Sequence, residues 1–269
     1  MTLVASLGMY DHPAQRSAND ALWHGIAHRL RGAGVPGVPD DLDRSRSVEA
    51  IWHDPRLLLA QACGYPLTAT DAPAVRLVAL PVYDVAGCDG ATHRSVIVVR
   101  EADRAAAVAD LRGQRVAINA ATSNTGMNLL RAVVAPLADG AAFFSQVVVT
   151  GGHRASAEAV VRDDADTAAI DCVTWAALRR HEPELTERLR VIATTGATTA
   201  LPFVTAAATS DAHIAAIRAA LAAVVADPAL TTARDALFLR DIVPADDTSL
   251  APVRSTEREA IALGYPTLR

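Results

Sequence analysis

Short apolar runs alternate with amphipathic stretches along most of the chain. The strongest apolar run, at residues 95–99, is rich in valine and isoleucine, which is typical of a buried strand. Predicted strands lie at residues 3–7, 75–81, 95–99, 115–119, 146–150, 167–170, 190–194 and 202–205, with a short strand or turn at 48–52. Predicted helices lie at residues 16–31, 55–63, 102–111, 126–134, 155–162, 175–181, 212–225 and 231–237. This alternation predicts an α/β protein with mainly parallel sheets flanked by helices.

The middle of the chain predicts a self-contained lobe. Residues 93–196 contain a regular succession of strands and helices, so they form one expected lobe. Residues 1–92 plus 197–269 are expected to form the other lobe, which is discontinuous in sequence. The chain then crosses twice between the lobes, near residues 92–95 and 195–200. Two crossings beside a ligand cleft are typical of binding proteins that close about a hinge.

Composition narrows the choice of partners. The chain has 269 residues, of which 51% are hydrophobic and 20% charged, as expected for a soluble globular protein. Its net charge of −5 gives no basic field for nucleic acid. An anionic ligand must therefore be held by local dipoles and hydrogen bonds. No apolar run predicts a membrane span, and Met1 leads into the first predicted strand without the charged start of a signal peptide.

The three cysteines leave two alternatives open. Cys63, Cys88 and Cys172 contain no C-x-x-C pair, which argues against a zinc ribbon or a redox motif of that type. A Cys63–Cys88 disulfide in an oxidising compartment and a set of buried thiols both fit the sequence.

The first candidate for ligand binding follows the predicted strand 115–119. A run of small polar residues, which includes Ser123, Asn124 and Thr125, precedes Gly126 at the start of a predicted helix. The first N–H groups of a helix lack internal partners and carry the positive end of its dipole. Hydroxyls and amides there make a cradle for an anion, although Ser and Thr also serve as simple helix caps.

Two further strand ends carry polar residues. After the strand at 146–150, a glycine turn leads to His153, which can donate to an oxyanion. After the strand at 167–170, Asp171 is expected to face the cleft and to accept a ligand proton or amine, with Thr174 nearby. The alternative is that Asp171 caps the helix that begins near Thr174.

In the other lobe, the candidate ligand contacts are aromatic and apolar side chains rather than groups with a catalytic or metal-binding role. Met9 and Tyr10 follow the first predicted strand, and Tyr65 lies in a turn near the expected cleft. His24 and His28 are four residues apart on a helix, but no third metal ligand accompanies them. The chain also has no P-loop, no G-x-S-x-G and no H-E-x-x-H motif, so we predict no metal, no cofactor and no catalytic residue.

Taken in order, these motifs resemble a known family. Ser123-Asn124-Thr125-Gly126, the Thr-Gly-Gly-His-Arg-Ala-Ser turn at 150–156 and Ala-Ile-Asp at 169–171 resemble the phosphate/phosphite/phosphonate substrate-binding proteins of ABC importers, as do residues 61–67 and 94–99. The chain looks like a divergent branch, because Asn124 replaces a hydroxyl residue, Gly152 a serine and His93 a tyrosine of the family pattern.

The resemblance implies a two-lobed type II periplasmic-binding fold, a small anionic ligand, an ABC permease as partner and a periplasmic location. It implies that Ser123–Gly126 takes the anionic oxygens, that His153 donates and that Asp171 accepts a ligand proton. Met9, Tyr10 and Tyr65 are then expected to cover the ligand, with His93 and Thr174 beside it.

Two other functions compete with this interpretation. The first is a cytoplasmic lyase-type enzyme on the same fold, with Asp171 or His153 as general base. The missing signal peptide favours it, whereas the family-like motifs favour the binding protein. The second is the effector part of a transcription regulator, but that needs an N-terminal DNA-binding helix and this sequence begins with a predicted strand.

Overall fold

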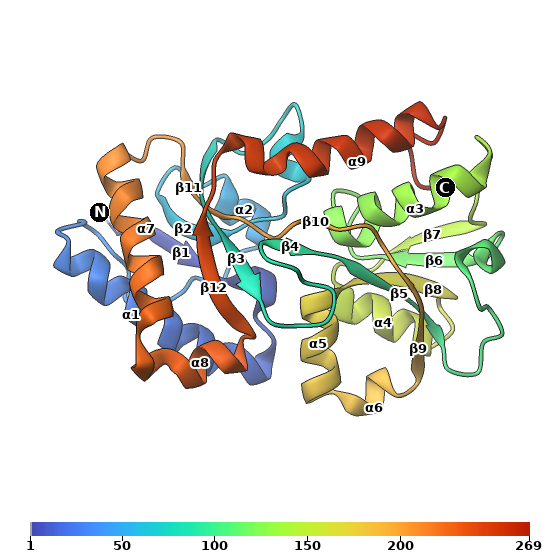
Figure 1. The fold of residues 1–269 in the computed structure, drawn as a ribbon, viewed down its shortest axis with the longest axis horizontal. Coiled ribbons are helices and arrows are strands. Elements are labelled where there is room, and N and C mark those ends of the chain that lie inside the picture. The colour runs from blue at the N-terminus through green and yellow to red at the C-terminus, as the bar shows by residue number, and fades with distance from the viewer. Residues whose placement is uncertain (1) are drawn as a thin grey trace. The chain divides into compact units, whose positions relative to one another are not determined.

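Two five-stranded sheets organise the chain, one in each of two units (Figure 1). The structure is a computed structural model that describes residues 2–269. Unit 1 holds the residues up to Asp84, Asp89–Ala91 and Thr199–Leu250, and unit 2 holds Val85–Cys88, Thr92–Thr198 and Ala251–Arg269.

The prediction of a mainly parallel sheet is wrong for unit 1, because three of the four neighbouring strand pairs in its sheet are antiparallel. Its strands stand in the order β1 (Val4–Ser6), β2 (Leu57–Gln61), β11 (Phe203–Ala206), β3 (Val75–Tyr83) and β12 (Leu239–Pro244). β1 and β2 are parallel neighbours, so the loops after both strands leave from the same edge of the sheet. β11 is antiparallel to β2 and β3, and β12 is antiparallel to β3.

Helices cover this sheet with apolar stripes. The stripe predicted for residues 16–31 is confirmed, because Leu22, Ile26 and Leu30 are buried on α1 (Arg16–Gly32). α1 packs against α7 (Asp211–Ala226) and α8 (Thr231–Ala236), which in turn contact β12. The short α2 (Val48–Trp52) packs against β1 and β2.

The sheet of unit 2 contains the predicted parallel strands and one strand that runs in the opposite direction. Its order is β7 (Gln146–Val149), β6 (Arg115–Ile118), β8 (Thr167–Asp171), β5 (Ser95–Arg100) and β9 (Leu189–Thr194). β6 is parallel to β7 and β8, whereas β5 is antiparallel to β8 and β9. The helices of this unit are α3 (Leu129–Ala138), α4 (His153–Val161), α5 (Cys172–His181), α6 (Pro183–Thr186) and α9 (Ala251–Ala262). A separate two-stranded sheet pairs β4 (Thr92–His93) with β10 (Thr198–Thr199).

Three local predictions are wrong. Residues 48–52 form helix α2 rather than a short strand or turn, and residues 57–61 form strand β2 rather than part of a helix. Every residue of β2 is buried, and such a strand shows no alternation that would distinguish it from a helix. The helix expected at 102–111 is reduced to one 3₁₀ turn at Val108–Leu111, because the carboxylates of Asp103 and Asp110 accept hydrogen bonds from nearby backbone N–H groups.

The end of the chain also differs from expectation. Ala251–Arg269 belongs to unit 2, whereas the sequence predicts residues 197–269 in the same lobe as residues 1–92. α9 packs against α3, and the C-terminal Arg269 carbonyl accepts hydrogen bonds from the N–H groups of Phe143 and Phe144 at 2.7 and 3.1 Å. These contacts between distant parts of the sequence decide the assignment.

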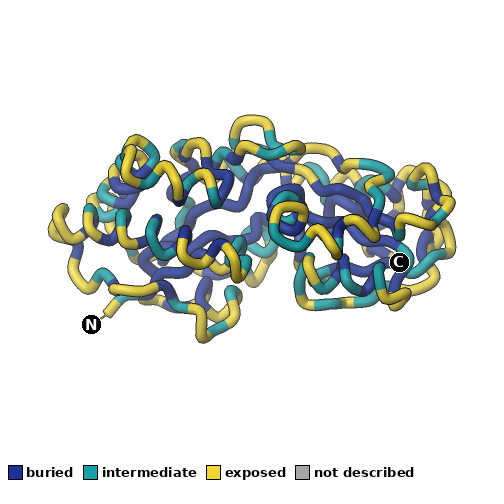
Figure 2. Tube along the Cα trace, turned by 90° about the horizontal axis from the view of Figure 1, so that it is seen from below, coloured by how far each residue is buried: buried dark blue, intermediate teal, exposed yellow. Residues whose placement is uncertain are grey.

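Figure 2 shows the chain coloured by burial, and the strands β2, β8 and β11 are buried along their whole length. In unit 2 one core cluster packs strand residues such as Val98, Ala117 and Ile170 against Ala157 of α4. Among residues 2–269, no single helix has the length and hydropathy needed to cross a membrane. One bent pair, α7 with Pro228–Ala236, meets those two criteria together.

Candidate functional site

The predicted cradle begins directly after β6. Ser123 is the residue before the first helical turn, and its hydroxyl accepts a hydrogen bond from the N–H of Gly126 at 3.0 Å. Ser123 is therefore a helix cap, which is the alternative to anion binding that the sequence also allowed. The turn that follows, η5 (Asn124–Asn128), is a single π-helical turn that runs into α3, and such turns recur at functional sites.

A second loop meets the cradle. Gly151, at φ +89°, turns the chain after β7, and α4 begins at His153. Nε2 of His153 lies 2.9 Å from Oγ1 of Thr125. β6 and β7 are adjacent and parallel, so the two loops leave one edge of the sheet and their side chains meet. Burial of the imidazole lowers the pKa of His153, although the charge of Asp171 opposes this, and the ring is neutral at neutral pH.

Gly126 lies in a position with no room for a side chain. A Cβ built there would be 1.9 Å from Oδ1 of Asn119, 3.0 Å from its Cγ and 3.2 Å from Cε1 of His153. The backbone of the cradle thus approaches Asn119 at the end of β6 and His153 on α4 at the same time. A side chain at this position would force the Asn119 side chain to move, whether or not a ligand is bound.

Asp171 and His93 form a buried pair. Nδ1 of His93 lies 3.1 Å from Oδ2 of Asp171, and both side chains are almost completely buried. Oδ1 of Asp171 accepts hydrogen bonds from the N–H groups of Val173 and Thr174 at 2.9 and 3.1 Å. The alternative in which Asp171 caps a helix is therefore confirmed, for α5. Burial alone would raise the pKa of the Asp171 carboxyl, but the charge of His93 and these hydrogen bonds hold it below its ordinary value.

The cradle rests on residues that the sequence did not single out. Oγ of Ser95, at the start of β5, donates to the backbone carbonyl of Thr125 at 2.8 Å. The buried Asn124 side chain donates to Oγ1 of Thr198 at 3.3 Å and accepts from Nδ2 of Asn128 at 2.9 Å. Behind them, the buried guanidinium of Arg131 donates to Oδ1 of Asn128 at 2.7 Å. Asn124 therefore belongs to an internal polar network, which explains an amide at a position where the family pattern has a hydroxyl.

The predicted ligand-binding residues do not include Ser95 and Asn119. Their positions in the sequence could have indicated a role at the site, because each stands at one end of a predicted strand. Nothing in the local sequence, however, indicates that β5 runs antiparallel to β8, and that direction is what brings Ser95 beneath Thr125.

The candidates of unit 1 also lie at one sheet edge. Met9 and Tyr10 lie in η1 (Gly8–Tyr10) after β1, and Tyr65 follows β2. Met9 and Tyr65 are half-buried against the same apolar cluster of this unit. The Tyr10 ring packs edge-on against Tyr83, with centroids 5.4 Å apart. Their contact with a ligand stays a prediction.

The structure gives the three cysteines as thiols rather than as a Cys63–Cys88 disulfide. Cys63 is buried with the apolar cluster of unit 1. Cys88 instead lies beside Cys172 in unit 2, with 3.5 Å between the two sulfur atoms.

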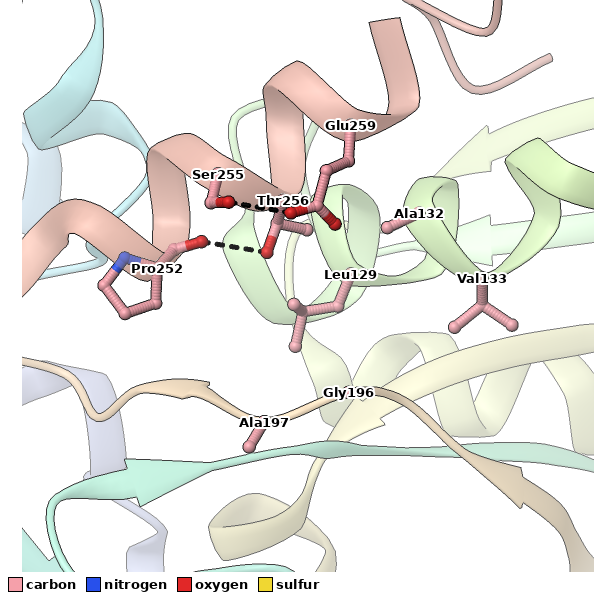
Figure 3. A pocket seen from close by; sticks show the side chains of 9 residues that line it. All are labelled: Leu129, Ala132, Val133, Gly196, Ala197, Pro252, Ser255, Thr256 and Glu259. Carbon is pink, nitrogen blue, oxygen red and sulfur yellow. Dashed lines mark hydrogen bonds between the residues drawn. The ribbon is translucent and has the colours of Figure 1, made fainter. Parts of the chain in front are cut away.

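Unit 2 also contains a cavity of about 410 Å³ with a different lining (Figure 3). The cavity is lined by Leu129 and Val133 of α3, by the Gly196–Ala197 segment and by α9. On α9, the carboxylate of Glu259 accepts a hydrogen bond from the hydroxyl of Ser255. None of the residues predicted to bind ligand is among those that line this cavity.

Comparisons with known proteins give one family and one fold. The model of a family described as the periplasmic phosphonate substrate-binding protein of ABC transporters matches residues 57–250. No curated protein is a significant match to the sequence.

Among solved structures, a binding protein component of an ABC phosphonate transporter from Pseudomonas aeruginosa is 15% identical over 97% of this chain and 88% of its own, with a TM-score of 0.77. PhnD1 from Prochlorococcus marinus, in complex with methylphosphonate, is 13% identical over 96% and 97%, with a TM-score of 0.74. XAC2383 from Xanthomonas citri, bound to ATP, is 17% identical over 97% and 98%, with a TM-score of 0.71. At these identities the likeness concerns the fold, and it confirms the predicted fold class.

Proposed function

Because this chain belongs to the family of periplasmic phosphonate substrate-binding proteins of ABC transporters, we propose that unit 2 holds a phosphonate-class oxyanion at the start of η5. The predicted family is confirmed by the match over residues 57–250, and with it the general role of a solute-binding component of an importer. Periplasmic capture and delivery to a permease are the finer parts of the proposal. The methylphosphonate in PhnD1 supports this ligand class.

One observation carries the proposal, namely the 2.9 Å contact between Thr125 and His153. It joins two loops that each end at a helix N-terminus, where N–H groups and the dipole favour an anion. The proposal requires the tautomer with hydrogen on Nε2, in which His153 donates to Thr125 and the Thr125 hydroxyl proton is left for a ligand oxygen. An anion in this position is held by neutral donors, which suits a protein of net charge −5.

The environment of Asp171 supports binding rather than catalysis. A general base needs a carboxylate that is accessible to the substrate and has a pKa near the working pH. The Asp171 carboxylate is buried, it lies against His93 and two backbone N–H groups, and its pKa is lowered. We therefore assign it the role of fixing α5 and His93 rather than of exchanging protons with a ligand.

Titration calorimetry tests the proposal with methylphosphonate, inorganic phosphate, phosphite and ATP as ligands. Replacement of Thr125 by valine keeps the volume of the side chain and removes one donor. If that donor serves a charged oxygen, the Thr125→Val variant should lose about 1.5–3 kcal/mol of binding free energy, or roughly 10–150-fold in affinity. Recovery of the ligand unchanged, measured by mass spectrometry, accompanies each titration.

Ser145→Ala provides the matched control. Ser145 lies just before β7, at the opposite end of that strand from His153, and it is exposed. Its loss should leave affinity unchanged, and a thermal melt of each variant checks that folding is intact. Equal affinities of wild type and Thr125→Val for a ligand that binds would reject the cradle. Consumption of ligand by the wild-type protein would favour the enzyme instead.

A further inference from the structure

Two thiols of unit 2 lie in contact at the start of α5. The sulfur atoms of Cys88 and Cys172 are 3.5 Å apart, although 83 residues separate them in sequence. Cys172 is buried, whereas Cys88 is half-buried and open to reagents from solution. We propose that Cys88 and Cys172 are a redox pair that closes to a disulfide under oxidising conditions and fixes the Val85–Cys88 segment onto α5.

The backbone around Cys88 is held close enough for this bond. A Cβ built on Gly87 would lie 2.9 Å from Cβ of Cys172, and Gly87 adopts a φ of +101° that favours glycine. The N–H of Cys88 donates to the carbonyl of Val85 at 3.1 Å, which closes a turn. On the other side, the N–H of Cys172 donates to the carbonyl of Arg94 at 3.0 Å. Both cysteines are therefore positioned by backbone hydrogen bonds, and rotation of the side chains can bring the sulfurs to bonding distance.

The position of the turn gives the bond a structural role. Val85–Cys88 packs with unit 2, whereas the residues on either side of it, up to Asp84 and from Asp89, belong to unit 1. In the thiol form, side-chain and backbone contacts alone hold this turn on unit 2. A covalent bond would make the attachment permanent next to Asp171, the residue that precedes Cys172 and pairs with His93.

The chemistry requires an external disulfide such as glutathione disulfide. The thiolate of Cys88 attacks it, forms a mixed disulfide and releases one glutathione. The sulfur of Cys172 then attacks the sulfur of Cys88, forms the internal bond and releases the second glutathione. The two cysteines lose two electrons and two protons, and two glutathione thiols are formed. Once Cys88 is in the mixed disulfide, it no longer acts as the hydrogen-bonding thiol that contributes most to the raised pKa of Cys172.

The test uses the full chain, reduced and then equilibrated in buffers with increasing ratios of oxidised to reduced glutathione. After acid quenching, thiols are alkylated under denaturing conditions and counted by intact mass. We expect three alkylated cysteines in the reduced protein and one in the oxidised protein, with peptide mapping placing the remaining thiol at Cys63. Cys63→Ser should oxidise in the same way, and Cys88→Ser should not form the internal bond.

A thermal melt gives the second measurement. A bond between Cys88 and Cys172 closes a long loop, so oxidation should raise the melting temperature of the wild type by about 10–15 °C. Cys88→Ser should melt like the reduced wild type in either buffer. Three alkylated cysteines at every ratio, a bond that includes Cys63, or oxidation without a rise in melting temperature would each overturn the proposal.

Discussion

Replacement of Gly126 by alanine should damage the cradle in a way that a second substitution repairs. The new Cβ would lie 1.9 Å from Oδ1 of Asn119, whereas real Cβ contacts essentially never fall below 3.0 Å. The Asn119 side chain must therefore move by about 1 Å, and His153, with Cε1 at 3.2 Å, leaves little room beside it. Overpacking of this kind costs about 1–3 kcal/mol of unfolding free energy.

The assay is a set of four thermal and denaturant melts. For a protein of this size, a loss of about 1–3 kcal/mol corresponds to a fall of roughly 3–9 °C in melting temperature. Asn119→Ala removes both atoms that the new Cβ meets most closely, so Gly126→Ala should cost less in the Asn119→Ala background than in the wild type. The expected coupling between the two sites is about 1–2 kcal/mol, which a double-mutant cycle resolves.

Gly152→Ala is the control for the effect of replacing a glycine that has free space around it. Gly152 is extended, with φ −169°, and nothing lies within 4 Å of a Cβ built on it. Its replacement should change stability by less than about 1 kcal/mol. If Gly126→Ala is no more harmful than Gly152→Ala, or if Asn119→Ala gives no relief, then the close approach at Gly126 is not what holds the cradle in place.

Three further predictions concern the polar groups around the site. Asp171→Asn should lower the unfolding free energy by about 1–3 kcal/mol in denaturant melts, because a buried charged acceptor of three donors is lost. Asp110→Asn, which alters an exposed acceptor of two backbone N–H groups, should cost less, and equal losses would argue against the His93–Asp171 pair. Burial lowers the pKa of the His153 imidazole below its usual 6.5 in the folded state. The neutral imidazole therefore contributes its full share of the unfolding free energy above pH 6.5, and this share is lost as the pH falls through the lower pKa of the folded state. Melts between pH 8 and 5 should therefore fall less steeply for His153→Asn than for wild type, and parallel curves would contradict this. Arg131→Met should lower the unfolding free energy by about 3 kcal/mol or more, because it leaves Oδ1 of Asn128 and the Pro266 carbonyl without this donor. Glu257→Gln, which alters only a 3.6 Å ion pair with Arg131, should change the unfolding free energy by no more than about 1 kcal/mol.

Local sequence determined the elements on which the cradle is built. Short branched runs and helical periodicity predicted the strands β6, β7 and β8 and the helices between them, because side-chain spacing within one element follows from its own geometry. The small polar residues at 123–125 and Asp171 likewise indicated helix starts, since a capping side chain bonds to a backbone only two or three residues away. These interactions are short in sequence, so they can be predicted from a short window.

Tertiary structure decided what the sequence pattern could not. The antiparallel direction of β5 places Ser95 beneath Thr125, and the pairing of His93 with Asp171 joins two segments that are far apart in sequence. The C-terminal helix α9 packs against α3, so it belongs to unit 2, although its position after unit 1 in the chain predicts the opposite. The fully buried strand β2 lies where the sequence predicts a helix, for a related reason: its environment on both faces comes from other segments. Each of these features depends on which distant surfaces pack together, and the spacing of residues within one segment carries no information about its neighbours in space.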